Sequence, residues 1–395
     1  MNDTARQLRF GVVGIGARSQ LATHADDSGP GSAVVAVCDP AAAQRQAGVE
    51  RFTAAKAYAD HRDLLDLDLD GVFLTTPDHL HAGPAIDFLS AGVAVFVEKP
   101  LAITTADCDR VLETARATGA RLYVGHNMRH MPVVQAMRSL ITDGAIGDVK
   151  AIWCRHFVGH GGDFYFKDWH ADRTKTTGLL LQKGAHDIDV MHWLAGGYTR
   201  RATGMGGLVL YGDNPDRMDR TGQRLRDFYD PEHNWPPAAQ RGLAPVLDVE
   251  DLSMANLALD NGVFLTYQQC HFTPDYWRNY TVIGTHGRLE NFGDSPGGVV
   301  KVWNARRSDY RADADLEVPI PEAEGSHSGA DPRLVAEFVR FVRDGGTTLT
   351  SPVAAREAVA AGCAATDSLR HGSMPVDVPP LDPDLIAYFN RGQVR

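Results

Sequence analysis

Short apolar runs alternate with amphipathic stretches along the first third of the chain, at a spacing typical of repeated strand–helix units. The apolar runs predict parallel strands at residues 9–13, 33–38, 71–75, 93–97 and 121–125. The amphipathic stretches predict helices at residues 82–91 and 104–118. This pattern indicates a Rossmann-type doubly wound sheet, in which ligands bind at the carboxyl ends of the strands.

Predicted strands follow one another in the second half of the chain, with few helices between them. They lie at residues 149–157, 251–259, 263–271, 278–283, 288–292 and 299–303. Asp260-Asn261-Gly262 is a strong hairpin signal between two of them. Two closing helices are predicted at 332–343 and 352–370. We therefore predict a Rossmann domain over residues 1–127, followed by an α/β domain over residues 128–395. The second domain would contain a large open, mainly antiparallel meander, and its C-terminal helices would pack back toward the first domain.

A glycine-rich turn follows the first predicted strand, in Gly14-Ile15-Gly16-Ala17-Arg18-Ser19. Glycines there permit a tight turn and a close approach of the backbone to a pyrophosphate. Ser19 stands where the dinucleotide-binding fingerprint usually has Gly or Ala. The second strand ends at Asp39, the position from which an acid binds the adenosine ribose and repels a 2′-phosphate. The sequence thus favours NAD over NADP, although Arg45 nearby weakens that preference.

Polar residues follow the later strands of the predicted parallel sheet. Glu98-Lys99-Pro100 comes directly after a buried strand, and a desolvated lysine in such a place can exchange a proton with a substrate hydroxyl. We expect Glu98 to contact the cofactor ribose or carboxamide. The other expected cofactor contacts after these strands are Thr76, Pro77, His79, His81, Lys99 and Asn127.

Five segments together give the chain a family resemblance: Gly11–Gly16, Thr76–His81, Glu98–Pro100, Gly125–Arg129 and Gly178–Asp189. In this order they resemble the glucose-fructose oxidoreductase, inositol dehydrogenase and rhizopine-catabolism (Gfo/Idh/MocA) family. The resemblance implies a Rossmann domain, a second α/β domain on an open antiparallel sheet, and chemistry on sugars or polyols. It also implies a cis Lys99–Pro100 bond and a homo-oligomer, dimer or tetramer, that buries the open sheet face.

The active-site helix of that family has a counterpart in Gly178–Asp189. His186 keeps the place of the catalytic-type histidine, but Gln182 replaces the Asp that dehydrogenase members usually carry before it. Because Gln182 cannot exchange a proton, a simple Asp-His-Lys relay is in doubt. Lys183 next to it would supply a positive charge to a developing alkoxide or an anionic substrate group. An alternative is that Lys183 is an ordinary surface lysine and His186 a core residue.

Two long segments between predicted elements have the length of functional loops. Residues 159–177 gather basic and aromatic groups, which would form a lid with a Trp stacked on a sugar face and cations that bind an anionic group. The alternative is a solvated loop. Residues 211–248 form an insertion that would border the cleft or a neighbouring subunit. The expected substrate contacts are Lys99, His126, Arg129, Trp169, Arg173, Lys175, Lys183 and His186.

The composition of the chain excludes some classes of binding partner and indicates a cellular compartment. The chain has 395 residues and a net charge of −11, which argues against nucleic acid and anionic membranes as partners. It contains no long apolar run, and its first residues do not resemble a signal peptide, so we expect a cytoplasmic protein. Five scattered cysteines indicate reduced thiols, and no metal-binding spacing is present.

These observations lead to one function and two alternatives. We predict an NAD-dependent oxidoreductase that oxidises a secondary hydroxyl of a sugar, sugar derivative or cyclitol, with Lys99 and His186 as catalytic residues and Lys183 as a third candidate. The first alternative is a redox-neutral, NAD-dependent glycoside hydrolase, which oxidises a sugar hydroxyl transiently, eliminates the substituent, adds water and returns the hydride. The second is a sugar-binding regulator with an inactive Rossmann fold.

Overall fold

The computed structural model describes residues 6–26, 31–223, 225–230 and 232–394, which fall into two compact units. The first unit comprises the residues up to His126, Asp331–Arg356 and those from Leu381 onward; the second comprises Asn127–Ala330 and Glu357–Pro380. The chain therefore passes between the units after residues 126, 330, 356 and 380. The predicted second domain was continuous to residue 395, whereas two of its C-terminal segments belong to the first unit.

A six-stranded parallel sheet forms the centre of the first unit, with the order β3-β2-β1-β4-β5-β6. Its strands are β1 (Leu8–Val13), β2 (Ser32–Cys38), β3 (Lys56–Tyr58), β4 (Gly71–Leu74), β5 (Ala94–Val97) and β6 (Leu122–Val124). Its helices are η1 (Ala17–Ala22), α1 (Thr23–Asp26), α2 (Ala42–Arg51), η3 (His61–Leu64), η4 (Asp78–Leu80), α3 (Ala82–Ser90), α4 (Thr105–Thr118) and α13 (Pro383–Asn390). The chain reverses its direction of sheet growth between β1 and β4, where such sheets bind ligands.

A late helix completes the core of this first unit. Helix α11 (Ser326–Asp344) brings the fully buried Phe338 within 5.1 Å of the Phe73 ring and 5.5 Å of the Phe96 ring, measured between centroids. Phe10 and Tyr123 pack on the same ring at 5.8 and 5.6 Å. Aromatic burial of this size explains why Asp331–Arg356 belongs with the first unit.

The second unit is built on a nine-stranded mixed sheet with the order β14-β13-β12-β11-β7-β10-β9-β8-β15. The strands are β7 (Val149–Val158), β8 (Thr199–Gly207), β9 (Leu252–Leu259), β10 (Phe264–Cys270), β11 (Tyr276–Gly284), β12 (Arg288–Phe292), β13 (Val299–Trp303), β14 (Leu316–Pro319) and β15 (Val376–Asp377). The prediction of a mainly antiparallel sheet is confirmed. The predicted meander is wrong, because β7 lies between β10 and β11 and pairs with β10 in parallel.

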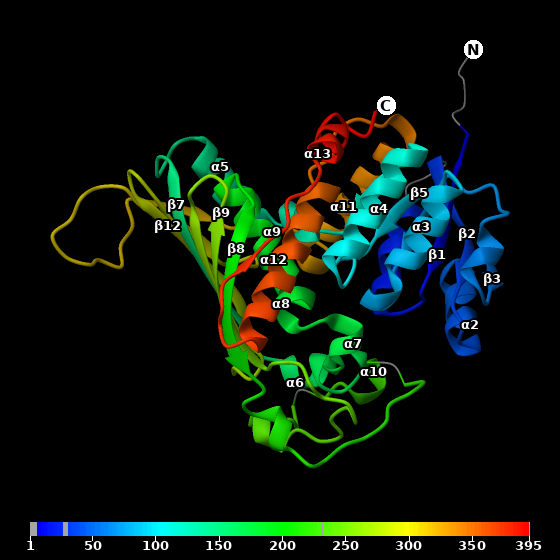
Figure 1. Cartoon of the computed structure of the whole chain (residues 1–395), viewed down its shortest axis with the longest axis horizontal. Coiled ribbons are helices and arrows are strands. Elements are labelled where there is room, and N and C mark those ends of the chain that lie inside the picture. Colours follow the sequence, from blue (N-terminus) through cyan, green and yellow to red (C-terminus); the bar gives the residue numbers. More distant parts are fainter. Residues whose placement is uncertain (1–5, 27–30, 224, 231, 395) are drawn as a thin grey trace. The chain divides into compact units, whose positions relative to one another are not determined.

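Helices cover one face of this sheet and leave the other open (Figure 1). The helices of the second unit are η5 (Asn127–His130), α5 (Pro132–Thr142), α6 (Gly161–Tyr165), η6 (Trp169–Ala171), α7 (Arg173–Thr176), α8 (Leu179–Gln182), α9 (Gly184–Ala195), η7 (Tyr211–Asp213), α10 (Leu225–Phe228) and η8 (Pro237–Ala239). Helix α12 (Pro352–Arg370) contains the boundary between the units. On the open face, Trp153 and Phe264 are 52% and 64% exposed. Trp153, Arg155, Gln268 and Glu290 line a hollow of about 620 Å³ there. No helix in the described part of the chain is both long and apolar enough to span a membrane.

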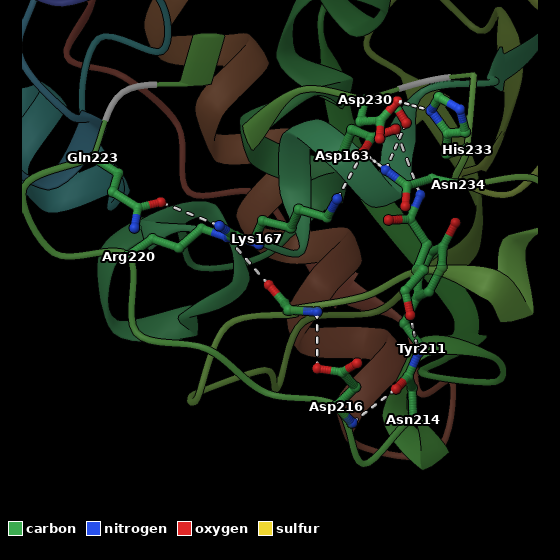
Figure 2. Close-up of polar contacts among 12 residues, drawn as sticks. Asp163, Lys167, Tyr211, Asn214, Asp216, Arg220, Gln223, Asp230, His233 and Asn234 are labelled. Carbon is green, nitrogen blue, oxygen red and sulfur yellow. Dashed lines mark hydrogen bonds and ion pairs between the residues drawn. The ribbon is translucent and has the colours of Figure 1, made fainter. Parts of the chain in front are cut away.

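The insertion at residues 211–248 is held by buried carboxylates (Figure 2). Asp163 of α6 is 2% exposed and accepts hydrogen bonds from Lys167 Nζ at 2.8 Å and Asn234 Nδ2 at 2.7 Å. Asp251 accepts three backbone N–H bonds, including those of Leu210 and Tyr211 at 2.9 and 2.8 Å. The described residues of the insertion therefore belong to the folded body of the second unit.

Candidate functional site

The glycine-rich turn after β1 has the backbone that a dinucleotide site requires. Gly14 has a φ of +87°, and a Cβ there would lie 2.7 Å from the backbone nitrogen of Thr76, so only glycine fits. A Cβ at the exposed Gly16 would meet nothing within 4 Å. The space beside Gly16 is therefore open, as a pyrophosphate bound to this turn needs. Ser19 is fully buried and donates a hydrogen bond to the Gly16 carbonyl at 2.7 Å, so it closes the turn.

The end of β2 lies against this turn. Asp39 accepts hydrogen bonds from the backbone N–H of Ile15 and of Ala41, both at 2.9 Å. The half-buried carboxylate retains further lone pairs for ribose hydroxyls. Arg45 Nη1 donates to the carbonyls of Asp39 and Pro40 at 2.7 and 2.9 Å. The Arg45 guanidinium, which could bind a 2′-phosphate, is thus already hydrogen-bonded to the backbone.

A buried ion-pair cluster lies after β5, at the end of the same sheet. Arg18 Nη2 lies 2.6 Å from Glu98 Oε1, and Arg18 Nη1 lies 3.0 Å from Asp331 Oδ2. Burial alone would lower the pKa of Arg18, but the two carboxylates outweigh it and raise that pKa. The other oxygen of Glu98 accepts the backbone N–H of Lys99 at 2.8 Å. Both carboxylate oxygens of Glu98 therefore have a partner, and they hold Arg18 and the Lys99 backbone; a contact of Glu98 with the cofactor stays a prediction.

Lys99 is half-buried, and the Lys99–Pro100 bond is cis, as the resemblance implied. His81 supports this turn: its Nδ1 lies 2.7 Å from the Pro100 carbonyl oxygen, and its Nε2 lies 2.9 Å from that of Thr76. Because both ring nitrogens bind backbone, His81 joins the loop after β4 to the turn after β5. Of the other residues expected to contact the cofactor, Ala17 is exposed and Thr76, Pro77 and His79 are partly exposed.

Lys183 and His186 of the second unit lie where α8 meets α9. Lys183 ends α8 and is 8% exposed, while His186 in the first turn of α9 is 9% exposed and Gln182 is 5% exposed. Lys183 Nζ donates to the Tyr276 hydroxyl at 2.9 Å and lies 5.6 Å from the centroid of the Tyr165 ring. Lys183 is therefore a buried cation and not an ordinary surface lysine.

A row of buried polar side chains crosses the helix-covered face of the sheet beneath α9. Arg278 of β11, His156 of β7, Gln269 of β10 and Ser253 of β9 are successive neighbours in the strand register. Asp187 of α9 lies over this row, with its carboxylate 2.9 Å from both Arg278 Nε and His156 Nδ1. Burial is the largest effect on the pKa of His156 and, with the charge of Arg278, lowers it to about 3. His156 is thus a neutral donor to Asp187.

Three residues that we expected to contact the substrate form ion pairs with carboxylates instead. Arg129 is 5% exposed and forms a two-point ion pair with Asp189, at 2.8 and 2.7 Å. Arg173 Nε lies 2.9 Å from Asp248 Oδ2, and Lys175 pairs with its neighbour Asp172. These cations have structural partners and do not gather around Lys183.

The remaining expected contacts lie in two different environments. His126 and Asn127 are buried, at 2% and 1% exposure. Trp169 stacks on His170, with ring centroids 3.8 Å apart, and His170 packs on Tyr165 at 5.3 Å. Through Tyr165, the aromatic part of the 159–177 segment thus reaches Lys183.

Sequence reasoning missed Asp331, Asp187, Arg278 and Tyr276, each of which completes a cluster around a predicted residue. Asp331 is 313 residues from Arg18, and Tyr276 is 93 residues from Lys183. No local spacing encodes such partners. The available signal was weaker: Arg278 begins the strand predicted at residues 278–283, and an arginine on the buried face of a strand implies a carboxylate partner.

Taken together, the first unit has the parts that hold a dinucleotide, namely an open glycine turn and a carboxylate at the end of the second strand. The second unit has ionisable groups near its surface, held by a buried polar network. The first unit therefore suits a dinucleotide, and the groups of the second unit suit proton transfer.

Comparisons with known proteins agree with this arrangement. Residues 8–126 match the NAD-binding Rossmann-fold domain of the Gfo/Idh/MocA oxidoreductase family, and residues 138–378 match the C-terminal alpha/beta domain of that family. Inositol 2-dehydrogenase of Salmonella paratyphi B is 35% identical over 191 residues, which cover 47% of this chain and 54% of that protein. The 2,7-anhydro-N-acetylneuraminate hydratase of Mediterraneibacter gnavus is 32% identical over 200 residues, 48% of this chain and 50% of the relative. The chain thus spans about half the length of these relatives.

A solved structure extends the likeness in fold to nearly the whole chain. Levoglucosan dehydrogenase in complex with NADH and L-sorbose has a TM-score of 0.77 at 20% sequence identity, covering 95% of this chain and 100% of the other. At this identity the likeness concerns the fold alone. Because matches to the family's two domains together account for most of the sequence, the resemblance seen in the motifs is confirmed: this chain belongs to the Gfo/Idh/MocA family of NAD-binding oxidoreductases.

Proposed function

We propose that this protein is an NAD-dependent oxidoreductase that oxidises a secondary hydroxyl of a sugar, a sugar derivative or a cyclitol. The observation that carries the proposal is the open turn at Gly14 and Gly16 beside the Asp39 carboxylate, on the same sheet that presents Lys99. The names of its relatives support a polyol or sugar substrate, since they include an inositol dehydrogenase and a levoglucosan dehydrogenase.

In this proposal, the turn at Gly14 and Gly16 and the Asp39 carboxylate would hold NAD, which would supply the acceptor for the hydride of the carbon that carries the hydroxyl. Lys99 takes the hydroxyl proton, and the bond from its N–H to Glu98 holds the backbone from which its side chain extends. His186 hydrogen-bonds the substrate and assists that proton transfer. Asn127 and the 159–177 segment position the sugar, while Arg129 acts indirectly by fixing the turn after Asn127 to Asp189.

A redox-neutral reaction is the second candidate, and Gln182 with Lys183 favours it. An amide at position 182 cannot relay a proton, while the buried ammonium of Lys183 is bound to a tyrosine hydroxyl. The hydratase among the relatives supports a reaction that ends in addition of water. In this candidate function, transient oxidation of a sugar hydroxyl would be followed by elimination and hydration, on an anionic sugar in particular.

Cofactor retention separates the two functions. The purified protein would be passed through gel filtration, and its ultraviolet spectrum and the mass of any released nicotinamide would be recorded. It would then be incubated with NAD and with myo-inositol, levoglucosan or 2,7-anhydro-N-acetylneuraminate. NADH formed in proportion to substrate supports the dehydrogenase, whereas retained nicotinamide with product but no net NADH supports the redox-neutral reaction. Absence of nicotinamide binding by titration would contradict both.

We also propose that a second copy of this chain covers the open face of the nine-stranded sheet. Trp153 of β7 and Phe264 of β10 expose large apolar groups on adjacent strands, beside the Arg155–Glu290 pair at 3.7 Å. An exposed apolar patch rimmed by polar groups is typical of a protein interface. The same patch on two copies can pair around a twofold axis.

A further inference from the structure

Tyr276 occupies the first position of β11, and its hydroxyl accepts a hydrogen bond from Lys183 Nζ at 2.9 Å. It precedes Arg278 by two residues and therefore lies on the same face of the strand. The residue is 43% exposed, whereas Lys183 and Arg278 are only 8% and 6% exposed. The ring of Tyr276 is thus accessible from the surface of the second unit, while its hydroxyl lies against the shielded Lys183.

The charges around this hydroxyl favour its ionised form. Desolvation opposes ionisation of Tyr276, but the charges of Arg278 and Lys183 outweigh it and lower the pKa of the phenol to about 8. Asp187 acts in the opposite direction, and its carboxylate is balanced by Arg278 at 2.9 Å. His156, whose ring centroid lies 5.6 Å from that of Tyr276, is neutral because its pKa is lowered to about 3.

Lys183 is a cation with no carboxylate partner in the part of the chain that the structure describes. It contacts the Tyr276 hydroxyl at 2.9 Å and the aromatic rings of Tyr165 and Tyr276, whose centroids lie 5.6 and 5.3 Å from Nζ. Burial alone would lower the pKa of Lys183, yet the two tyrosines raise it above its ordinary value. An ammonium held in this way stabilises a phenolate, or an enolate formed beside it.

Oxidation of a hydroxyl to a carbonyl requires one proton acceptor, and the proposed function assigns that role to Lys99. A separately built acid–base pair in the second unit gives the protein the capacity for a second proton transfer. We propose that Tyr276 is a further catalytic acid–base residue, which removes the proton from the carbon adjacent to the newly oxidised carbon, and that Lys183 is its positioning residue. This inference rests on the proposed function, because the adjacent carbon is acidic only after the hydroxyl has been oxidised.

The step balances without a further reagent. The Tyr276 phenolate forms an O–H bond with the proton, the C–H bond breaks, and its electron pair forms the double bond of an enolate. The negative charge moves to the enolate oxygen, where Lys183 can stabilise it. Where the next carbon carries an oxygen substituent, that C–O bond breaks with its electron pair, the leaving oxygen takes up a proton from solvent, and an unsaturated ketone results. When water adds in the reverse sense, its oxygen bonds to that carbon, its released proton goes to solvent, and protonated Tyr276 returns its proton to the adjacent carbon.

The first test measures the phenol without any substrate. The phenolate ultraviolet absorbance of the purified protein would be titrated with pH for wild type, Tyr276→Phe, Lys183→Met and Lys183→Arg, with Tyr310→Phe as the control because Tyr310 is 78% exposed. We expect a phenol that titrates near pH 8, as the pKa of about 8 implies, and that is lost only in Tyr276→Phe. In Lys183→Met its midpoint should move toward the ordinary value of about 10, and Lys183→Arg should restore it. A wild-type phenol at the ordinary value would overturn the proposal.

The second test measures proton exchange at carbon. Wild type and Tyr276→Phe would be incubated in heavy water with NAD and each of myo-inositol, levoglucosan and 2,7-anhydro-N-acetylneuraminate, and the recovered sugars analysed by mass spectrometry. We expect deuterium on carbon with wild type, and a loss of at least about 10²-fold in Tyr276→Phe that exceeds its loss of NADH formation. NADH formation without carbon deuteration in wild type would overturn the role of Tyr276 and leave the proposed function standing. If no probe reduces NAD and no nicotinamide binds, the proposed function fails, and the role for Tyr276 that rests on it fails with it.

Discussion

Cofactor selection at Asp39 provides a quantitative test of the first unit. A 2′-phosphate carries a charge of about −1.5, and at about 6 Å from the Asp39 carboxylate it would be repelled by about 1 kcal/mol in water and about 4 kcal/mol at an effective dielectric constant of 20. Asp39 is half-buried at the surface, so the lower part of that range applies. Because about 1.4 kcal/mol is a factor of ten, we expect NADH to bind at least about ten times more tightly than NADPH.

The informative substitution is Asp39→Asn, which removes the charge but keeps one oxygen to accept the Ile15 or Ala41 N–H bond. Dissociation constants for NADH and NADPH would be measured by calorimetric titration at two salt concentrations. We expect the NADPH-to-NADH ratio to fall about tenfold in Asp39→Asn, and the wild-type ratio to shrink with added salt because ions screen the repulsion.

Asp60→Asn is the matched control for this experiment. Burial and then the charges of Asp39 and Asp60 raise the pKa of the Cys38 thiol, so Asp60 lies near the same strand end, but it caps η3 through the Arg62 N–H at 2.9 Å. Its removal should leave the cofactor ratio near the wild-type value. Equal affinities of wild type for the two cofactors, or a ratio that Asp39→Asn does not change, would refute the assignment of Asp39 to the ribose.

Four other predictions follow from the described contacts. Lys99→Ala and His186→Ala should each lower turnover by about 10² to 10⁴ with NADH affinity near normal, and full activity of both variants would place the chemistry on other residues. Trp153→Glu should reduce the mass seen by light scattering to that of a single chain, unless wild type is already monomeric. His192 has a folded pKa of about 4, against about 6.5 when unfolded, because burial disfavours its charge; the unfolded chain binds the proton first, so the free energy of unfolding should fall by up to about 3 kcal/mol between pH 6.5 and 4. His192→Gln should lose this share of the dependence in pH-resolved denaturant titrations, while His156, whose pKa is lowered to about 3, keeps its own share. Phe338→Ala should lower the free energy of unfolding by about 3–5 kcal/mol in chemical denaturation, and a loss below about 1 kcal/mol would show that the aromatic core tolerates the cavity.

Most of the Rossmann strands were predictable because they are short, apolar and buried on both faces. Strand β3 was not predicted because it is an edge strand of three residues, Lys56–Tyr58, with no buried position. Strand β8 was missed for a different reason. A Cβ at Gly204 would lie 2.1 Å from the carbonyl oxygen of Ala365 in α12, so this strand needs glycine where a typical strand has an apolar side chain. The close helix that explains this glycine is distant in sequence.

The same distinction holds for the candidate site: some of its residues follow from local motifs, and others come from segments distant in sequence. The turn at Gly14 and the cation at Lys99 follow from motifs of a few residues, and each lies at a strand end as predicted. The partners of Arg18 and Lys183 could not be predicted, because Asp331 and Tyr276 come from elements far along the chain. Sequence reasoning therefore found candidates for the chemistry but missed the groups that set their charge.

Helix α11 is translated long after the sheet on which it packs, and this order affects how the protein folds during synthesis. Residues up to His126 leave the ribosome before Phe338, and the intervening stretch of roughly 200 residues takes about 10–40 s at about 5–20 residues per second. During that interval the rings of Phe73 and Phe96 lack the aromatic group that packs against them in the finished core. A nascent chain stalled before α11 would therefore expose an apolar aromatic surface that chaperones can bind. Because the nucleotide-binding unit is completed only from the other end of the chain, its folding must finish after translation of the second unit is nearly complete.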